Sequence, residues 1–242
     1  MENNKKKSLI PKAALIKAWL IWETFPQTCY NYERMMGQVV AHMFSAIIGF
    51  LYKDDPSKRK EVMKREIEFF NVHIEFGSCI LGMAVALEEQ KAMGENIPGE
   101  FITNLKTSLM GPLAGMGDTI WQGVVIPILL AVCIDLTRSG SGNVWGAVIY
   151  AVVIVVAAYA LSYWNFMFGY KAGSEAIMDF LEKGILNKLI KGASIMGCMV
   201  MGGLIVNYVK VKCGLVIHTS GSDFSLQESL FDAVLPNILP LL

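Results

Sequence analysis

The stretch GPLAGMGDTIWQG, residues 111–123, places one carboxylate, one amide and one tryptophan among four glycines in an otherwise apolar region. Asp118 offers carboxylate oxygens that can accept hydrogen bonds from two adjacent hydroxyls, and Gln122 can donate or accept beside it. Trp121 offers a flat apolar surface on which a sugar ring can stack. These three side chains together predict a carbohydrate-binding site.

The backbone around these side chains is rich in residues that disfavour a continuous helix. Gly111, Pro112, Gly115 and Gly117 lie within seven residues, and glycine and proline both destabilise helix interiors. We therefore predict a broken or re-entrant helix over residues 107–135, because transporters use such breaks to expose backbone groups at their substrate sites. A carboxylate beside a break at membrane depth is costly to bury, which favours a functional role for it.

A purely structural interpretation of the same residues is also open. Thr119 followed by Gln122 has the spacing of a capping box, so the stretch could simply begin a helix that runs to Ile134. Gly111 and Gly115 have the GxxxG spacing that lets membrane helices approach closely. The candidate sugar-binding residues are Asp118, Thr119, Trp121 and Gln122.

Other polar residues along the chain are weaker candidates. A cluster near the amino end could be a buried network or half of a binding surface, and an acidic pair could be the solvated end of an apolar helix. The histidine in FFNVHIE suggests phosphorylation, but a lone histidine on an apolar helix is more often a core residue. These weaker candidates are Asn31, Glu33, Arg34, His73, Glu88 and Glu89.

No recognisable catalytic or metal-binding motif accompanies these residues. The sequence has no GxSxG, Walker loop, HExxH or cysteine-histidine cluster, and its five cysteines lack metal or redox spacing. We therefore expect a protein that is not an enzyme by itself and that uses no metal or cofactor.

The composition is that of a membrane protein. Apolar residues make up 54% of the chain and charged residues only 17%, with a mean hydropathy of +0.45, whereas about a quarter of a soluble domain is charged. The 21 basic and 21 acidic residues balance, so the charge gives no indication of a nucleic-acid partner. We predict an all-α polytopic membrane protein.

One segment is long enough to span a bilayer alone. Residues 139–170 are 32 positions without a charge, and residues 144–169 are a nearly continuous apolar run, which exceeds the roughly 20 residues that a span needs. Residues 119–134 and 192–209 are marginal, and residues 77–87 are too short. Because such segments need protein cover at membrane depth, we expect a partner chain.

The distribution of basic residues predicts the orientation. Four lysines follow the long apolar run whereas only Arg138 precedes it, so the run ends in the cytoplasm and the amino end is cytoplasmic.

Leu15, Trp19 and Trp22 have the spacing of a helix that lies in the membrane interface. Alternating apolar residues around a Thr-Ser-Gly-Ser turn predict an extracytoplasmic β-hairpin. The expected organisation is N-terminal cytoplasmic and interfacial amphipathic helices over 1–65, a membrane core over 66–209, the hairpin over 210–228, and the start of a truncated C-terminal membrane helix over 229–242.

Five blocks of sequence, in order, closely resemble one family. They are NYERM at 31–35, EFFNVH at 68–73, ALEEQKAMGE at 86–95, MGPLAGMGDTIW at 110–121 and GASIMG at 192–197. They resemble the IID membrane subunit of mannose/fructose/sorbose-family sugar phosphotransferase systems over about residues 10–242. Two positions depart from the family pattern, because Thr119 and Trp121 stand where the family often has Ser and Phe.

The resemblance implies a function in sugar import. It implies pairing with a IIC subunit, assembly of IIC–IID pairs as trimers in the bacterial inner membrane, and passage of a hexose-type sugar where the subunits meet. Cytoplasmic IIB, recharged by IIA, would phosphorylate the arriving sugar, so the phosphate chemistry would belong to other chains. The rival functions are an ion-coupled secondary transporter subunit, with Asp118 carrying a proton, and a membrane scaffold without transport.

Overall fold

The computed structural model describes residues 8–138, 144–175, 195, 199, 216–219 and 222–225. The chain divides into two compact units, residues 1–193 and 194–242, which we describe separately. The first unit is helical, as predicted. Its elements are α1 (Lys12–Thr24), α2 (Gly37–Ser45), α3 (Ile48–Leu51), α4 (Pro56–Glu66), α5 (Ile74–Ala92), α6 (Gly99–Gly117), the π-helix η1 (Asp118–Val125), α7 (Ile126–Arg138) and α8 (Trp145–Glu175).

Helix α1 covers one side of the helical core. It follows Pro11 and ends at Thr24, close to Pro26, because the position before a proline disfavours helical backbone. Leu15, Trp19 and Trp22 are buried against the protein, so the face that we assigned to a membrane interface is in fact part of the core. The exposed apolar side chains of α1 are Ile16 and Leu20.

Helices α5 and α8 pack closely because glycines remove the side chains between them. A Cβ on Gly82 would lie 2.1 Å from the Phe166 carbonyl oxygen, and a Cβ on Gly169 would lie 2.0 Å from the Cys79 carbonyl oxygen. Small residues allow the same close approach between helices in membranes. These contacts hold the carboxyl-terminal half of α8 against the first half of α5.

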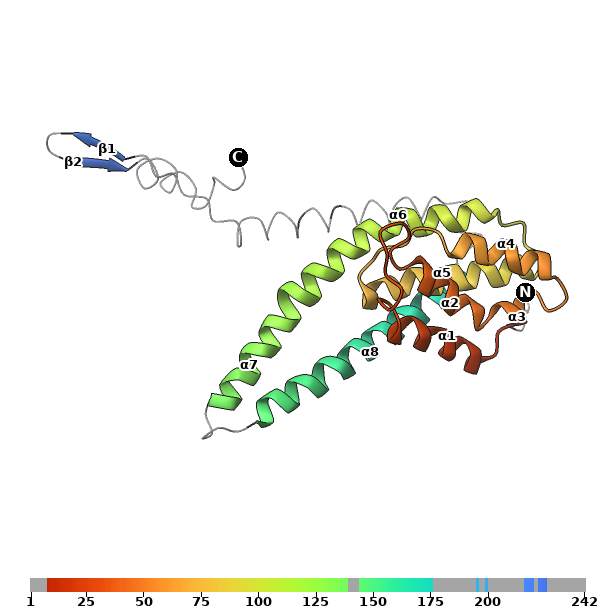
Figure 1. Ribbon diagram of the computed structural model, residues 1–242, viewed down its shortest axis with the longest axis horizontal. Coiled ribbons are helices and arrows are strands. Elements are labelled where there is room, and N and C mark those ends of the chain that lie inside the picture. Colours follow the sequence, from red (N-terminus) through yellow and green to blue (C-terminus); the bar gives the residue numbers. More distant parts are fainter. Residues whose placement is uncertain are drawn as a thin grey trace, which may run out of the picture. The chain divides into compact units, whose positions relative to one another are not determined.

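Residues 99–138 form one continuous helical run, and the predicted break is wrong. Figure 1 shows α6, η1 and α7 as a single long curved helix instead of a re-entrant hairpin. The Asp118 N–H donates to the carbonyls of Ala114 and Gly115, so the backbone at the glycines stays hydrogen-bonded. The Ile126 N–H donates to the Trp121 carbonyl, five residues back. This π-helical register ends just before Pro127, which has no N–H to donate.

Among the described residues, two helices are long and apolar enough to cross a membrane. They are residues 99–137 and 145–173, which contain 18-residue windows with mean hydropathies of 2.0 and 2.1. The second contains almost all of the predicted span 144–169. Helices α7 and α8 meet beside Gly146, whose Cβ would lie 2.3 Å from the Cys133 carbonyl oxygen, and they diverge from there (Figure 1).

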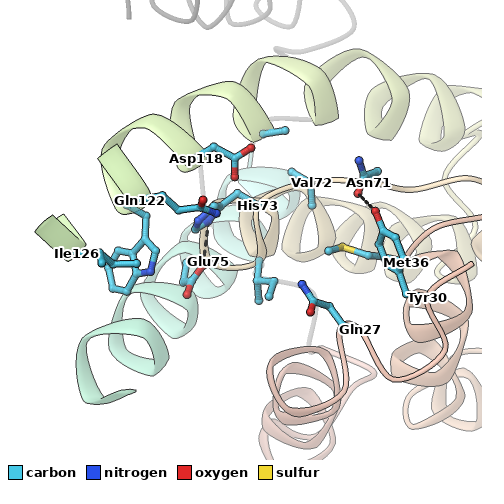
Figure 2. Close-up of a pocket in the computed structure, with 13 residues that line it drawn as sticks. Gln27, Tyr30, Met36, Asn71, Val72, His73, Glu75, Asp118, Gln122 and Ile126 are labelled. Atoms are coloured by element: carbon cyan, nitrogen blue, oxygen red, sulfur yellow. Dashed lines mark hydrogen bonds and ion pairs between the residues drawn. The ribbon is translucent and has the colours of Figure 1, made fainter. Parts of the chain in front are cut away.

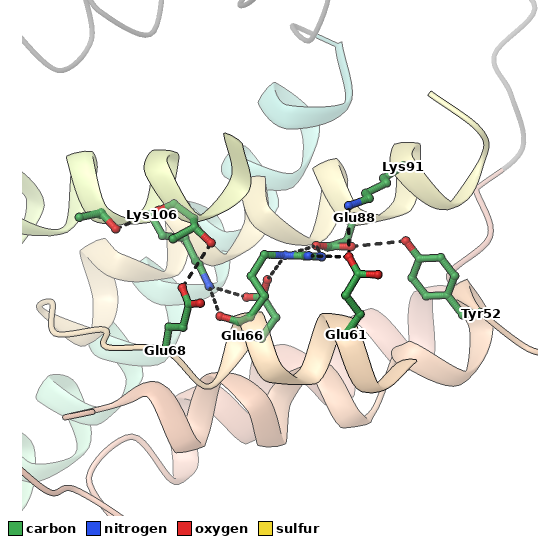
Figure 3. A network of polar contacts seen from close by, with 10 residues as sticks. Tyr52, Glu61, Glu66, Glu68, Glu88, Lys91 and Lys106 are labelled. Atoms are coloured by element: carbon green, nitrogen blue, oxygen red, sulfur yellow. Dashed lines mark hydrogen bonds and ion pairs between the residues drawn. The ribbon is translucent and has the colours of Figure 1, made fainter. Parts of the chain in front are cut away.

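A buried ionic network joins α4, α5 and α6 (Figure 3). Lys106 Nζ lies 2.7 Å from Glu66 Oε2, and the Arg65 guanidinium donates to Glu88 Oε1. Glu66 and Glu88 are both 0% exposed. The interpretation of Glu88 as a solvated helix end is therefore wrong, because its carboxylate is buried and accepts from Arg65 of α4, which lies 23 residues away along the chain.

The second unit contains a small antiparallel sheet. Strands β1 (Val216–Thr219) and β2 (Ser222–Ser225) pair with Val216 opposite Ser225 and Thr219 opposite Ser222. They lie within the segment 210–228 that we expect to form a hairpin. The predicted span 192–209, apart from residues 195 and 199, and the predicted helix 229–242 lie outside the described residues.

Candidate functional site

A cavity of about 990 Å³ lies beneath η1 and brings together segments from three parts of the chain (Figure 2). One wall is the end of α6 with η1, the floor is the beginning of α5, and the remaining edge is the loop after α1. Its size suits a small organic ligand. The lining residues are Gln27, Tyr30, Met36, Asn71, Val72, His73, Ile74, Glu75, Ala114, Asp118, Trp121, Gln122 and Ile126.

Three of the four predicted sugar-binding residues line this cavity. Asp118 and Gln122 are exposed and lie four residues apart on η1. Trp121 is only 8% exposed, and its ring lies edge-on to His73 with the centroids 6.5 Å apart. The cavity therefore presents a carboxylate, an amide and an indole on one wall.

Thr119 faces away from this site. It is buried, and its Oγ1 donates to the Gly115 carbonyl oxygen at 2.7 Å. A threonine that bonds to the carbonyl four residues back belongs to a helix interior and not to a helix start. The capping-box interpretation is therefore wrong, and Thr119 is not among the lining residues.

Gly117 allows His73 to reach the cavity. A Cβ on Gly117 would lie 2.4 Å from His73 Cβ and 2.5 Å from His73 Cγ, which is closer than such atoms can approach. Gly111 and Gly115 have no atom within 4 Å of the corresponding position. Of these three glycines, only Gly117 is explained by packing within the described part of this chain.

His73 and Glu75 form a buried pair on the floor of the cavity. His73 is the residue before α5 and Glu75 lies in its first turn; both are 7% exposed. His73 Nδ1 lies 2.9 Å from Glu75 Oε2, but without hydrogen-bond geometry, so Nδ1 has no hydrogen-bond partner among the described residues. The imidazole therefore lies against the Glu75 carboxylate on the cavity floor.

The loop after α1 forms the opposite edge. Tyr30 donates from its hydroxyl to Asn71 Oδ1 at 3.1 Å, and both residues line the cavity (Figure 2). Asn31 does not line it; its side-chain oxygen instead accepts from the backbone N–H groups of Glu33 and Arg34. Glu33 and Arg34 pair with each other at 3.1 Å and also lie outside the lining. This cluster shapes the loop and does not contact the cavity.

Glu89 has a role in anchoring the amino end of the chain. Its Oε1 accepts from the Leu9 N–H at 2.7 Å, the Ile10 N–H at 3.0 Å and the Ser8 hydroxyl at 2.7 Å. Tyr170 of α8 donates to the other carboxylate oxygen. The interpretation of Glu89 as a solvated helix end is wrong, because these groups bind its carboxylate. They lie about 80 residues away along the chain, so the residues next to Glu89 do not reveal them.

The arrangement can bind a polar ligand but offers no metal site. No group of three or more His, Cys, Asp or Glu side chains that could hold a metal ion occurs among the described residues. The sequence interpretation missed Gln27, Asn71 and Glu75 as cavity residues, whereas Tyr30 begins the amino-terminal cluster that could be half of a binding surface. A signal for Asn71 is its place inside the block EFFNVH.

A polar cavity beside two helices long enough to span a bilayer is typical of a membrane transport subunit. The family model described as PTS system mannose/fructose/sorbose family IID component matches residues 9–242. The chain belongs to this family and is the IID component of a mannose-family phosphotransferase transporter.

Relatives of known specificity are similar over most of their length. The mannose-specific EIID component of Escherichia coli strain K12 is 34% identical over 223 residues, which cover 89% of this chain and 77% of the relative. The fructose permease IID component of Bacillus subtilis strain 168 is 31% identical over 242 residues, covering 98% and 86%. The solved structure of the mannose transporter ManYZ with microcin E492 has a TM-score of 0.74 at 31% identity and covers 97% of this chain and 86% of that chain.

Proposed function

We propose that the cavity beneath η1 is the contribution of this chain to the sugar pathway of the transporter. The observation that carries the proposal is that Asp118, Trp121 and Gln122, chosen from sequence as sugar-binding residues, line one cavity. A sugar needs acceptors for its hydroxyl hydrogens, donors for its oxygens and an apolar surface for its ring face. Asp118 supplies the acceptors, Gln122 supplies a donor, and Trp121 supplies the apolar surface.

The floor of the cavity supplies further polar groups. His73 Nδ1 lacks a hydrogen-bond partner among the described residues and lies beside Glu75. Asn71 adds an amide at the edge. These side chains give the floor and edge of the cavity further groups that can exchange hydrogen bonds with sugar hydroxyls.

The exposed polar wall is also where a partner chain is expected. Asp118 and Gln122 are exposed on a helical run that is apolar enough to span a membrane, and polar groups at membrane depth normally face protein or a water-filled path. The partner in this proposal is a IIC subunit, with the IIC–IID pairs assembled as a trimer in the bacterial inner membrane. Cytoplasmic IIB, recharged by IIA, phosphorylates the arriving hexose-type sugar.

The orientation of the chain follows the distribution of lysines. The amino end is cytoplasmic, the β1–β2 hairpin is extracytoplasmic, and membrane lipid surrounds the apolar surface of α7 and α8. Exposed side chains such as Val152, Val156 and Trp164 suit that environment.

Sugar binding by the purified IIC–IID complex tests the proposed site. Asp118→Asn keeps the shape but removes the charge, and a hydrogen bond to a charged group is worth about 1.5–3 kcal/mol against about 1 for a neutral one. We expect the affinity measured by calorimetry to fall roughly tenfold, and Asp118→Ala to cost more. Asp135→Asn is the matched control, because Asp135 is an exposed carboxylate on the same helical run outside the cavity.

Two outcomes would count against this assignment. If Asp118→Asn assembles with IIC and binds sugar with wild-type affinity, the site lies elsewhere. If Asp135→Asn weakens binding as much as Asp118→Asn does, the effect belongs to the charge of the helix and not to the cavity.

A further inference from the structure

The loop after α1 is tied by its backbone to the segment that precedes α5. The Met36 N–H donates to the Phe70 carbonyl at 2.8 Å, and the Phe70 N–H donates to the Arg34 carbonyl at 3.2 Å. The Phe70 side chain is fully buried. The backbone and the side chain of Phe70 therefore fix the position of the next residue, Asn71, at the edge of the cavity.

A tight turn fixes Tyr30 on the other side of this edge. The residue after it, Asn31, accepts from the Met35 N–H at 2.8 Å through its carbonyl and from two more backbone N–H groups through its side chain. Met35 has a φ of 50°, a left-handed conformation that is uncommon for a residue other than glycine. These backbone constraints bring Tyr30 and Asn71 together without depending on the bond between their side chains.

The bond between these two side chains leaves the amide of Asn71 as a donor. The Tyr30 hydroxyl donates to Asn71 Oδ1 at 3.1 Å, and both residues line the cavity (Figure 2). Asn71 is exposed, and no protein group among the described residues accepts a hydrogen bond from its Nδ2. The edge of the cavity therefore offers two N–H donors, whereas the ionised Asp118 carboxylate on η1 offers only acceptors.

We propose that Tyr30 is a positioning residue that holds the Asn71 amide so that Nδ2 donates to a hydroxyl oxygen of the sugar. This inference rests on the proposed sugar site. Sugar hydroxyls both donate and accept, so the sugar can donate to Asp118 and accept from Asn71. Without the Tyr30 hydroxyl, the exposed amide is free to rotate, and the sugar has to order it on binding, which weakens the affinity.

Calorimetry of the IIC–IID complex, with mannose, fructose and sorbose as probes, measures the two contributions. Asn71→Ala should weaken binding roughly fivefold, the effect of one neutral hydrogen bond. Tyr30→Phe should weaken it roughly threefold, because the donor remains but its orientation is lost. Tyr30→Phe/Asn71→Ala should bind as Asn71→Ala does, because Tyr30 acts only through the amide. Tyr32→Phe is the matched control, since Tyr32 lies on the same turn, is 97% exposed and is not among the lining residues.

Monodeoxy and monodeoxyfluoro derivatives of the sugar that binds test the direction of the hydrogen bond. Fluorine accepts weakly from an N–H group but cannot donate, whereas the hydrogen of the deoxy sugar does neither. At the position that Asn71 contacts, the wild type should bind the fluoro derivative more tightly than the deoxy derivative. This preference should vanish in Asn71→Ala and shrink in Tyr30→Phe, and a purely structural role for Tyr30 would leave it unchanged.

The results separate this inference from the proposed site. If Tyr30→Phe binds with wild-type affinity while Asp118→Asn binds weakly, the role of Tyr30 is overturned and the site stands. Additive losses in Tyr30→Phe/Asn71→Ala also overturn that role, because Tyr30 would then contact the sugar directly. Absence of binding for all three sugars in the wild type overturns the site and this inference with it. Tyr30→Phe should keep IIC and the wild-type Tm, and a loss of either would assign Tyr30 to folding and refute the proposal.

Discussion

Replacing Gly117 by alanine should displace His73 and damage both stability and sugar binding. The new Cβ would lie 2.4 Å from His73 Cβ, so the two must separate by about 1 Å to reach an ordinary contact. The clash is with the root of the His73 side chain, which cannot rotate away as a flexible end could. Overpacking of this kind costs about 1–3 kcal/mol.

Gly111→Ala is the matched control on the same helix. It meets no atom within 4 Å, so it should keep the gain of about 1 kcal/mol that alanine has over glycine in a helix interior. Because Gly117→Ala has the same gain, the difference between the variants isolates the clash, at about 2 kcal/mol. For a chain of this length that corresponds to a gap of about 4–8 °C in Tm.

The assay is thermal unfolding of the IIC–IID complex, followed by sugar calorimetry at a temperature where both variants are folded. Gly117→Ala should unfold first and bind sugar more weakly, since His73 no longer lies beside Trp121 and Glu75 as it does now. Size-exclusion chromatography checks that both variants retain IIC. Equal Tm and equal affinity for the two variants would refute the role of Gly117 as the space for His73.

Three further predictions follow from the charged residues and from the family. Lys106→Met should lower the unfolding free energy by about 3–5 kcal/mol, because the buried Glu66 loses its hydrogen-bonded cation and keeps only Arg65, whose Nε lies 3.7 Å from Glu66 Oε1. In thermal unfolding, Lys106→Met/Glu66→Leu should recover most of that loss, and a double variant as unstable as the single one would contradict the pairing. Burial on folding raises the pKa of Glu23 to about 7, so the protonated form of Glu23 favours the folded state. Ionisation of Glu23 should therefore lower the stability progressively from pH 4.5 to pH 7. Glu23→Gln should therefore be more stable than the wild type at pH 8, by about 1 kcal/mol after allowance for partial exposure, and no different at pH 4.5; unfolding curves at both pH values test the sign. Uptake should require phosphoenolpyruvate with IIA and IIB and should survive a protonophore, and its loss in the protonophore would favour the secondary-transporter alternative.

The sequence predicted the long apolar helix α8 because its signal is local. Residues 144–169 have no charge over a length that only a membrane or a large core can bury, and α8 covers residues 145–169 of that run. The five motif blocks predicted the family because they are short and specific, and the family model confirmed that prediction. Both inferences need only the order of residues along the chain.

The predicted helix break failed because the local penalties are small. Glycine costs about 1 kcal/mol and proline about 3 in a helix interior, and a long apolar run offsets such costs by keeping its backbone hydrogen bonds. The structure absorbs Pro127 in a π-helical register instead of breaking the chain. The capping interpretation of Thr119 failed with the break, since a continuous helix leaves no helix start to cap.

The acidic pair at the end of α5 shows which information a local pattern lacks. Glu88 and Glu89 look like a solvated helix end from their neighbours, yet one accepts from Arg65 of α4 and the other from the backbone at Leu9 and Ile10. These partners are 23 and about 80 residues away along the chain. No helical periodicity around residue 88 contains them, so only the fold could identify the pair as anchors.

Those anchors explain how the floor of the cavity is kept in place. Helix α5 is tied to α4 through Glu88 and to the amino end through Glu89 at one end, and it packs on α8 through Gly82 along its length. His73 and Glu75 stand at its other end. A rigid α5 therefore holds the floor of the cavity fixed against the wall formed by η1, and Gly117 sets the distance between them. The open positions at Gly111 and Gly115 lie on the same helical run but touch nothing in the described chain. Gly117 therefore fits His73, whereas Gly111 and Gly115 have no neighbour of this kind among the described residues and leave a face of the helix open, where the IIC subunit is proposed to bind.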